Sequence, residues 1–170
     1  MAGIMLELVD DSLEPSEKVA RAIKSFKRIS ESEIFTHRKI TELMVEQVLA
    51  DIDFTDFNNN PKLFIDIVSK SGIYLVVLFD KLLAKGVDSE VAKNCLYAVA
   101  TSPVAYEFTR KVYELMGFPV EHILDIEWAS SYDLTKAKEK PYLIDGLNQY
   151  YFKGDDNMKF DVVVGNPPYN

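Results

Sequence analysis

Apolar and polar positions follow a helical period in the first third of the chain. Residues 16–30 and 37–51 repeat their apolar positions at intervals of three and four, which predicts two amphipathic helices. Thr36 precedes the second helix and is expected to be its N-cap. The apolar face of that helix is expected to consist of Ile40, Leu43, Met44 and Val48.

After the break at residues 58–61, short apolar runs alternate with helical patterns. Four of these runs predict buried strands, at residues 62–67, 95–100, 122–127 and 160–164. Helices are expected from Gly72 through Leu83 with Gly86 at the end, over residues 89–93, and from Pro103 to Gly117. Residues 129–158 carry no pattern that predicts one kind of element.

Strands that alternate with helices are typical of the α/β class, with a doubly wound and mostly parallel sheet. The connections of such a sheet are right-handed, and ligands bind at the carboxyl ends of its strands. Both candidate sites described below follow the end of a predicted strand.

Length and composition indicate what kind of α/β protein this is. The chain has 170 residues, enough for one domain with a core, and its single cysteine, Cys95, lies in an apolar run. We expect Cys95 to be a core residue and the protein to be cytoplasmic, since one cysteine forms no internal disulfide. The start of the chain does not resemble a signal peptide, and the longest apolar run, residues 72–79, is far shorter than the roughly 20 residues of a membrane span.

Net charge is −8, with a sequence pI near 4.8. Phosphate contacts in DNA complexes need lysine and arginine, so this charge opposes a DNA-binding function for these residues by themselves. Either DNA is held mainly by parts outside this chain, or DNA is not the substrate.

The strongest motif is residues 160–169, in which a buried strand runs into a rigid Pro-Pro turn between an amide and an aromatic ring. An exocyclic amine on a base is a poor nucleophile, because its lone pair is delocalised into the ring. An amide oxygen from Asn166 and the carbonyl of Pro167 are suited to accept its two hydrogens, and Tyr169 offers a face on which an extruded base can stack. Pro168 stiffens the turn.

Residues 64–75 form the second motif, a strand that ends at Asp66 and leads through a tight turn with Ser71 and Gly72 into a helix. Backbone N–H groups at a helix start suit a polar ligand, and glycine allows close approach to the backbone.

The run Asn-Pro-Pro-Tyr after Phe-Asp-Val-Val-Val-Gly resembles the catalytic motif of amino-methyltransferases, most closely the adenine-N6 DNA methyltransferases of bacterial restriction-modification systems. The resemblance implies S-adenosylmethionine as cofactor, double-stranded DNA as substrate, and a Rossmann-like methyltransferase fold of seven strands. It implies that Asn166 and the Pro167 carbonyl bind the target amine, and that Tyr169 stacks on the flipped adenine. No metal is implied.

Residues 66–72 are similar to the cofactor loop of that family at Asp66, Ser71 and Gly72, and depart from it at Ile67, where proline is usual, and Lys70, where glycine is usual. Residues 32–37 resemble a segment that lies against the methionine end of the cofactor, which implies contacts from Phe35 and Thr36.

Residues 96–105 are similar to the family's second strand and turn, which implies cofactor contacts from Ser102 and Pro103. Ala100 stands where an acid binds the ribose hydroxyls. The loss of a hydrogen bond to a charged group costs about 1.5–3 kcal/mol, so cofactor affinity is expected to be lower.

The resemblance divides the chain into a helical segment, residues 1–31, and a partial methyltransferase domain, residues 32–170, truncated after the fourth strand. We expect a chain with four strands of seven to be inactive alone, as part of a larger protein that works with restriction or specificity subunits. Two alternatives stay open: an amino-methyltransferase that acts on RNA or a protein glutamine, and a degenerate domain that serves as an interaction module.

Overall fold

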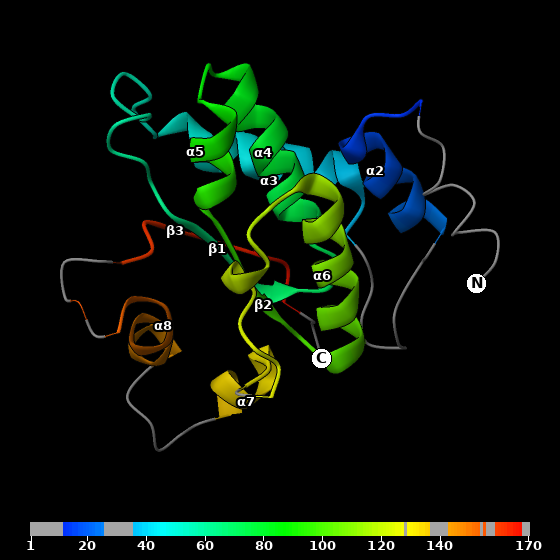
Figure 1. Ribbon diagram of the computed structural model, residues 1–170, viewed down its shortest axis with the longest axis vertical. Coiled ribbons are helices and arrows are strands. Elements are labelled where there is room, and N and C mark those ends of the chain that lie inside the picture. The colour runs from blue at the N-terminus through cyan, green and yellow to red at the C-terminus, as the bar shows by residue number, and fades with distance from the viewer. Residues whose placement is uncertain are drawn as a thin grey trace.

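The computed structural model describes residues 12–25, 36–127, 129–136, 143–153, 155 and 159–167. Within these residues the chain forms a small parallel sheet covered by helices (Figure 1). The strands are β1 (Phe64–Ser69), β2 (Leu96–Ala100) and β3 (Val162–Val164). The helices are α2 (Pro15–Ser25), α3 (Arg38–Ala50), α4 (Ile73–Ala84), α5 (Ser89–Asn94), α6 (Pro103–Met116), α7 (Ser131–Lys136) and α8 (Leu143–Phe152), with a 3-10 turn, η1, at Val120–His122.

The sheet has the strand order β2-β1-β3, with all pairs parallel. The chain passes from β1 to β2 on one side and returns across the sheet to β3 on the other. The switch point of the topology therefore lies between β1 and β3, where open α/β sheets bind their ligands. The register places Asp66 of β1 beside Ala98 of β2 and Val164 of β3.

Both faces of the sheet are covered, as the doubly wound prediction requires. The larger core packs Phe64, Leu96 and Ala98 against the helices α2 to α6. The smaller core joins Ile65 and Val99 to Leu147 of α8, on the alternate positions of the same strands. Figure 1 shows the corresponding separation, with α3, α4 and α5 together and α8 apart from them. The α/β fold class with a parallel sheet is confirmed at this level.

Helix α4 is the centre of the larger core. Every residue from Ile73 to Phe79 is buried, because the sheet, α2, α3 and α5 enclose it. A helix that is apolar on all sides is typical of such a position. It begins at Gly72, whose left-handed φ of 69° turns the chain sharply out of β1.

Several predicted ends are confirmed. Helix α6 begins at Pro103 with Ser102 as its N-cap and ends at Gly117, which has a left-handed φ of 68°.

The prediction that Cys95 is a core residue is also confirmed. Cys95 is 1% exposed, and burial raises the pKa of its thiol to about 12, so it is an unreactive core residue.

The strand predictions need correction. The first strand is shifted by two residues, to Phe64–Ser69, and the last shortens to Val162–Val164. The strand predicted at residues 122–127 was wrong: η1 covers Val120–His122, and only Ile123 forms a bridge, with Ala98. Asp125 then accepts the backbone N–H of Glu127 and turns the chain away from the sheet. The described residues therefore hold three strands, where four were predicted.

The cap and the buried face of α3 also differ from prediction. His37, not Thr36, is the N-cap, because its Nδ1 accepts the backbone N–H of Lys39. Ile40 and Leu43 are 54% and 63% exposed, whereas the fully buried positions are Thr41, Val45 and Leu49. Met44 and Val48, the other two predicted positions, are partly buried against the core. Helix α3 meets α4 with one face only, and that face is rotated by one position from the apolar stripe of the sequence.

Candidate functional site

The candidate site lies at the carboxyl ends of β1 and β3, the switch point of the sheet. Thr36, Asp66, Ser71 and Asn166, four of the residues singled out in the sequence, line one small cavity there together with Lys70. They come from the residue before the cap of α3, the middle of β1, the loop between β1 and α4, and the turn after β3. The fold therefore brings three separate motifs to one point.

Asp66 is the buried acid of this site, with an exposed fraction of 2%. Burial raises the pKa of its carboxyl to about 7, because desolvation penalises the charged form. The backbone N–H of Val68 donates to its Oδ1 at 3.1 Å, and this bond, with the Ser69 side chain and the charge of Lys70, opposes the rise. Asp66 therefore changes charge near neutral pH.

Gly165 brings the turn after β3 unusually close to β1. Its φ is 145°, a conformation that favours glycine, and a Cβ at this position would lie 2.5 Å from Cγ2 of Val68 and 3.0 Å from Oδ1 of Asp66. A side chain here would push the two strands apart. The glycine thus allows the turn that carries Asn166 to pass directly over the acid.

Asn166 is held through both its side chain and its backbone. Its Nδ2 donates to Oγ1 of Thr36 at 3.1 Å, and its carbonyl oxygen accepts from Nζ of Lys70 at 3.2 Å. The contact with Thr36 replaces the capping function that we predicted for that threonine. It joins the start of α3 to the turn after β3.

Lys70 fills the space in front of the loop. Its side chain is 8% exposed and extends from the end of β1 to the turn after β3. The cavity that remains among Thr36, Asp66, Lys70 and Asn166 has a volume of about 10 Å³, room for one water at most.

The loop itself has the shape of a ligand-binding turn. Gly72 opens α4 in a left-handed conformation, its N–H donates to Oγ of Ser69, and Ser71 is buried beside the cavity. A buried carboxyl group beside a helix start fits, in its chemistry, the charged amino-acid end of S-adenosylmethionine. The present cavity is too small for this ligand, so the Lys70 side chain must leave its position before the ligand can enter.

Ser102 and Pro103 lie elsewhere, at the end of β2. The hydroxyl of Ser102 accepts the N–H of Ala105 as the cap of α6, and neither residue lines the cavity beside Asp66. Ala100, in the position of the expected acid, is 1% exposed.

Sequence reasoning missed Ser131, the first residue of α7. Its hydroxyl is 2.6 Å from the carbonyl oxygen of Ile67 and 3.1 Å from those of Val99 and Ala100, so it covers the carboxyl ends of β1 and β2. No signal in residues 129–158 pointed to it. Asp133 accepts the N–H and the hydroxyl of Ser130, which gives this acid a local capping function.

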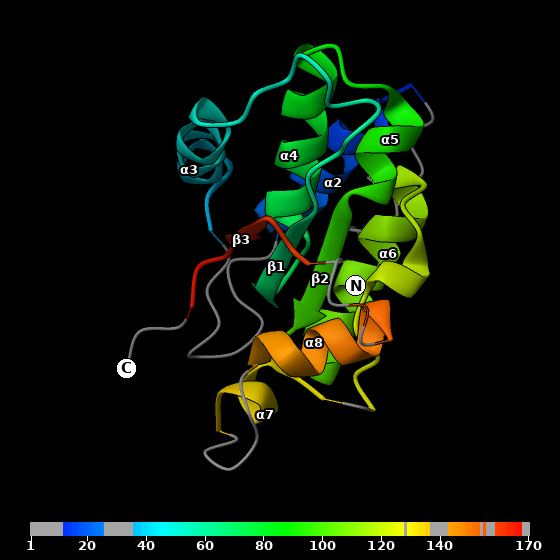
Figure 2. The ribbon, with the colours of Figure 1, turned by 90° about the vertical axis from the view of Figure 1, so that its left-hand side faces the viewer.

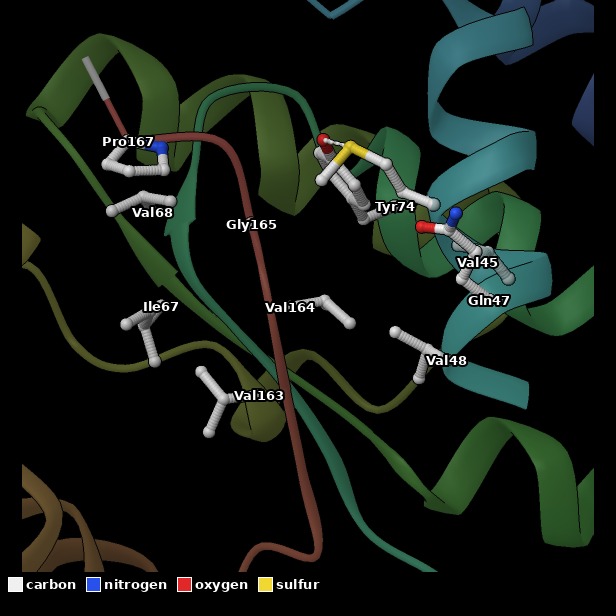
Figure 3. Close-up of a pocket in the computed structure, with 11 residues that line it drawn as sticks. Val45, Gln47, Val48, Ile67, Val68, Tyr74, Val163, Val164, Gly165 and Pro167 are labelled. Atoms are coloured by element: carbon white, nitrogen blue, oxygen red, sulfur yellow. Dashed lines mark hydrogen bonds between the residues drawn. The ribbon is translucent and has the colours of Figure 1, made fainter. Parts of the chain in front are cut away.

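A larger open pocket of about 300 Å³ lies beside the cavity, between α3 and β3. Figure 2 shows these two elements on the same side of the molecule. In Figure 3, Val45 and Val48 of α3 lie on the same side of β3 as Val164, whereas Val163 points to the other side of the strand, toward Ile67. Pro167 lines its rim next to Val68, and the hydroxyl of Tyr74 donates to Sδ of Met44 within it. The lining is mainly apolar. Phe35, Pro168 and Tyr169, the remaining predicted site residues, lie outside the described residues.

The turn after β3 and the whole of β2 lie in a segment that matches a protein-family model. Residues 94–170 match the Eco57I restriction-modification methylase family. No curated protein and no solved structure matches the chain. The family match supports a methyltransferase of the restriction-modification type. It includes Asn166 and Pro167, whereas Asp66, Lys70 and Gly72 precede the matched segment.

Two features are absent from the described residues. No three His, Cys, Asp or Glu side chains gather there in a way that would hold a metal ion. Among those same residues, no helix combines the length and the apolar character of a membrane span.

Proposed function

We propose that this chain carries the cofactor loop and the catalytic turn of a DNA methyltransferase that transfers a methyl group from S-adenosylmethionine to N6 of adenine, within a restriction-modification system. The observation that carries the proposal is the meeting of Asn166 with Asp66 at one cavity on the switch point of the sheet. The family match over residues 94–170 supports the methylase class independently. The Rossmann-like form of the sheet and the domain of residues 32–170 belong to the same proposal.

In this proposal the protein contributes mainly position. The Asn166 side-chain oxygen and the Pro167 carbonyl accept the two hydrogens of the adenine amine and turn its lone pair toward the donor. Pro168 stiffens the turn, and Tyr169 stacks on the extruded base. S-adenosylmethionine supplies an electrophilic methyl group. No strong general base is required, since the proton can leave after transfer.

The binding of the cofactor is proposed for Asp66, Ser71 and Gly72, with Phe35 and Thr36 near its methionine end and Ser102 and Pro103 at the end of β2. Asp66 in its charged form attracts the positive groups of the ligand. Ser71 and Gly72 place the first turn of α4 against it, where a helix N-terminus favours negative charge such as the ligand's carboxylate.

The substrate is tested by analysis of the product. The longest natural protein that contains these 170 residues is incubated with S-adenosylmethionine and duplex DNA, and the nucleosides are analysed by mass spectrometry. N6-methyladenine is expected, and Asn166→Ala should abolish it, whereas Asn58→Ala, an exposed asparagine distant in sequence, should not. Methylation of RNA or of a protein glutamine in place of DNA would contradict the proposal.

A second candidate function is a methyltransferase fold that no longer catalyses and serves as an interaction module. Lys70 in the loop and alanine at position 100 favour it, because the first fills the space in front of Asp66 and the second removes a ribose ligand. Absence of cofactor binding both in the wild type and in Lys70→Ala would favour this candidate.

A further inference from the structure

The side-chain amide of Asn166 has a defined orientation. An asparagine amide presents an acceptor oxygen at one end and a donor NH₂ group at the other. Because the NH₂ group donates to Oγ1 of Thr36, the oxygen is turned away from that threonine. The acceptor oxygen is therefore the end of the Asn166 amide that faces a group approaching from the side away from Thr36.

Thr36 is well placed to fix this orientation, because the start of α3 is anchored to the core. Arg38, two residues later, forms an ion pair with Asp80 of α4 at 2.9 Å and a second one with Glu42. The buried Thr41 lies one turn further along α3, whose contacts are mainly with α4. Thr36 is thus tied to the same helix that begins at the cofactor loop.

The segment that carries Asn166 has fewer constraints of its own. Strand β3 pairs with β1 as far as Val164, and Gly165 follows with a φ of 145°. The Lys70 ammonium contacts the backbone carbonyl of Asn166, which leaves the rotation of the side chain undetermined. Among the described residues, the hydrogen bond to Thr36 is the contact that reaches the side-chain amide itself.

We infer that Thr36 is a positioning residue that aims the amide oxygen of Asn166 at the substrate, and so selects an amino group over a carbonyl group at that position. The inference rests on the proposed function, which it deepens. A lone N–H donor on the substrate matches the exposed oxygen, whereas a carbonyl would place two acceptors against each other.

The test uses nuclear magnetic resonance of the ligand-free, isotope-labelled 170-residue chain. In the wild type, the Asn166 NH₂ protons should show contacts to the Thr36 methyl group, and the order parameter of the side-chain amide should be close to that of rigid backbone, about 0.85. In Thr36→Val the order parameter should fall below about 0.6, the range of flexible groups. Thr36→Ser should restore it, because serine keeps the accepting oxygen.

The exposed Thr55 provides the matched control, since Thr55→Val makes the same chemical change away from Asn166 and should leave its amide signals unchanged. An equally rigid amide in Thr36→Val, or no rescue by serine, would overturn the inference. The proton contacts in the wild type decide the orientation of the Asn166 amide even if Thr36→Val does not fold. Absence of these contacts would also overturn the inference. Because no ligand is present, this result is independent of cofactor binding, so failure of the proposed function is recognised separately.

Discussion

At the scale of single residues, the site is governed by two buried ionisable groups. Asp66 lies under the turn after β3, and Lys70 covers it and contacts the Asn166 carbonyl. The proposed ligand accounts for the buried Asp66, because a carboxylate attracts the cationic groups of S-adenosylmethionine. The lysine opposes that ligand by its volume and its charge. The balance between these two residues decides whether the site binds a cofactor.

The raised pKa of Asp66 predicts a specific dependence of stability on pH. The unfolded chain releases this proton near pH 3.8 and the folded chain near pH 7. The stabilising contribution is therefore complete below about pH 4 and is lost as the pH rises to about 7, up to about 4 kcal/mol in total. Asp66→Asn should remove this dependence when the free energies of unfolding by urea are compared at each pH. An identical pH profile for both proteins would contradict the buried, neutral carboxyl group.

The position of Lys70 predicts that a shorter side chain improves cofactor binding. In Lys70→Ala the space in front of Asp66 opens, and no hydrogen bond to Asn166 has to be broken before the ligand enters. A hydrogen bond that involves a charged group corresponds to about 1.5–3 kcal/mol, so the dissociation constant for S-adenosylmethionine should fall by a factor of about 10 or more. The exposed Lys159→Ala serves as the control and should have no effect. Weaker binding in Lys70→Ala would mean that the lysine holds the ligand.

At the scale of elements, the turn after β3 depends on close contact with β1. The short strand β3 has three residues, and its continuation passes over Asp66 because Gly165 has no side chain. The sequence predicted this strand and its turn from an apolar run that ends in Gly-Asn-Pro-Pro. It could not predict the contact between Thr36 and Asn166, because 130 positions separate them and no local pattern links the two segments.

A methyl group at Gly165 should therefore disrupt the turn. In Gly165→Ala the new Cβ meets Val68 at 2.5 Å in a strained backbone conformation, which should destabilise the protein by about 1–3 kcal/mol. Gly86→Ala is the matched control, since Gly86 also has a positive φ, 84°, but no atom lies within 4 Å of the added group. Equal losses in denaturant unfolding of the two variants would show that the close approach to β1 has no energetic effect.

Helix α3 and the failed strand show where local patterns lose their predictive value. The apolar stripe of α3 indicated Ile40 and Leu43, but the docking of the helix on α4 selects the neighbouring positions, including the polar Thr41. The run at residues 122–127 had the composition of a strand, but one bridge at Ile123 was its entire pairing. In both cases tertiary contacts, which a single sequence does not contain, decided the outcome.

At the scale of the whole molecule, the parallel α/β sheet with its covering helices followed from the alternation of strands and helices. The switch point is read from the observed strand order. The sequence did not predict the exact strand boundaries or the number of strands in the described residues, because short strands depend on their neighbours in the sheet. The net charge of −8 remains the main feature that the fold does not explain. DNA binding through these residues alone would have to overcome that charge.

The chain alone should therefore have little affinity for DNA. Non-specific DNA-binding proteins have dissociation constants of about 10⁻⁴ to 10⁻⁶ M at physiological salt. Fluorescence anisotropy with a labelled duplex should show binding weaker than about 10⁻⁴ M for these 170 residues, even at low salt, where electrostatic attraction would be strongest. Binding in the micromolar range would contradict the view that the DNA-binding surface lies outside the chain.

The central claim is that the end of β1 and the turn after β3 form a site for S-adenosylmethionine. Calorimetric titration of the chain with S-adenosylmethionine tests it most directly, beside Asp66→Ala and the exposed control Asp53→Ala. We predict saturable binding that Asp66→Ala weakens by a factor of at least about 10, the loss of a hydrogen bond to a charged group, and that the control leaves unchanged. Binding that is indifferent to Asp66, or no binding even when Lys70 is replaced by alanine, would contradict the account.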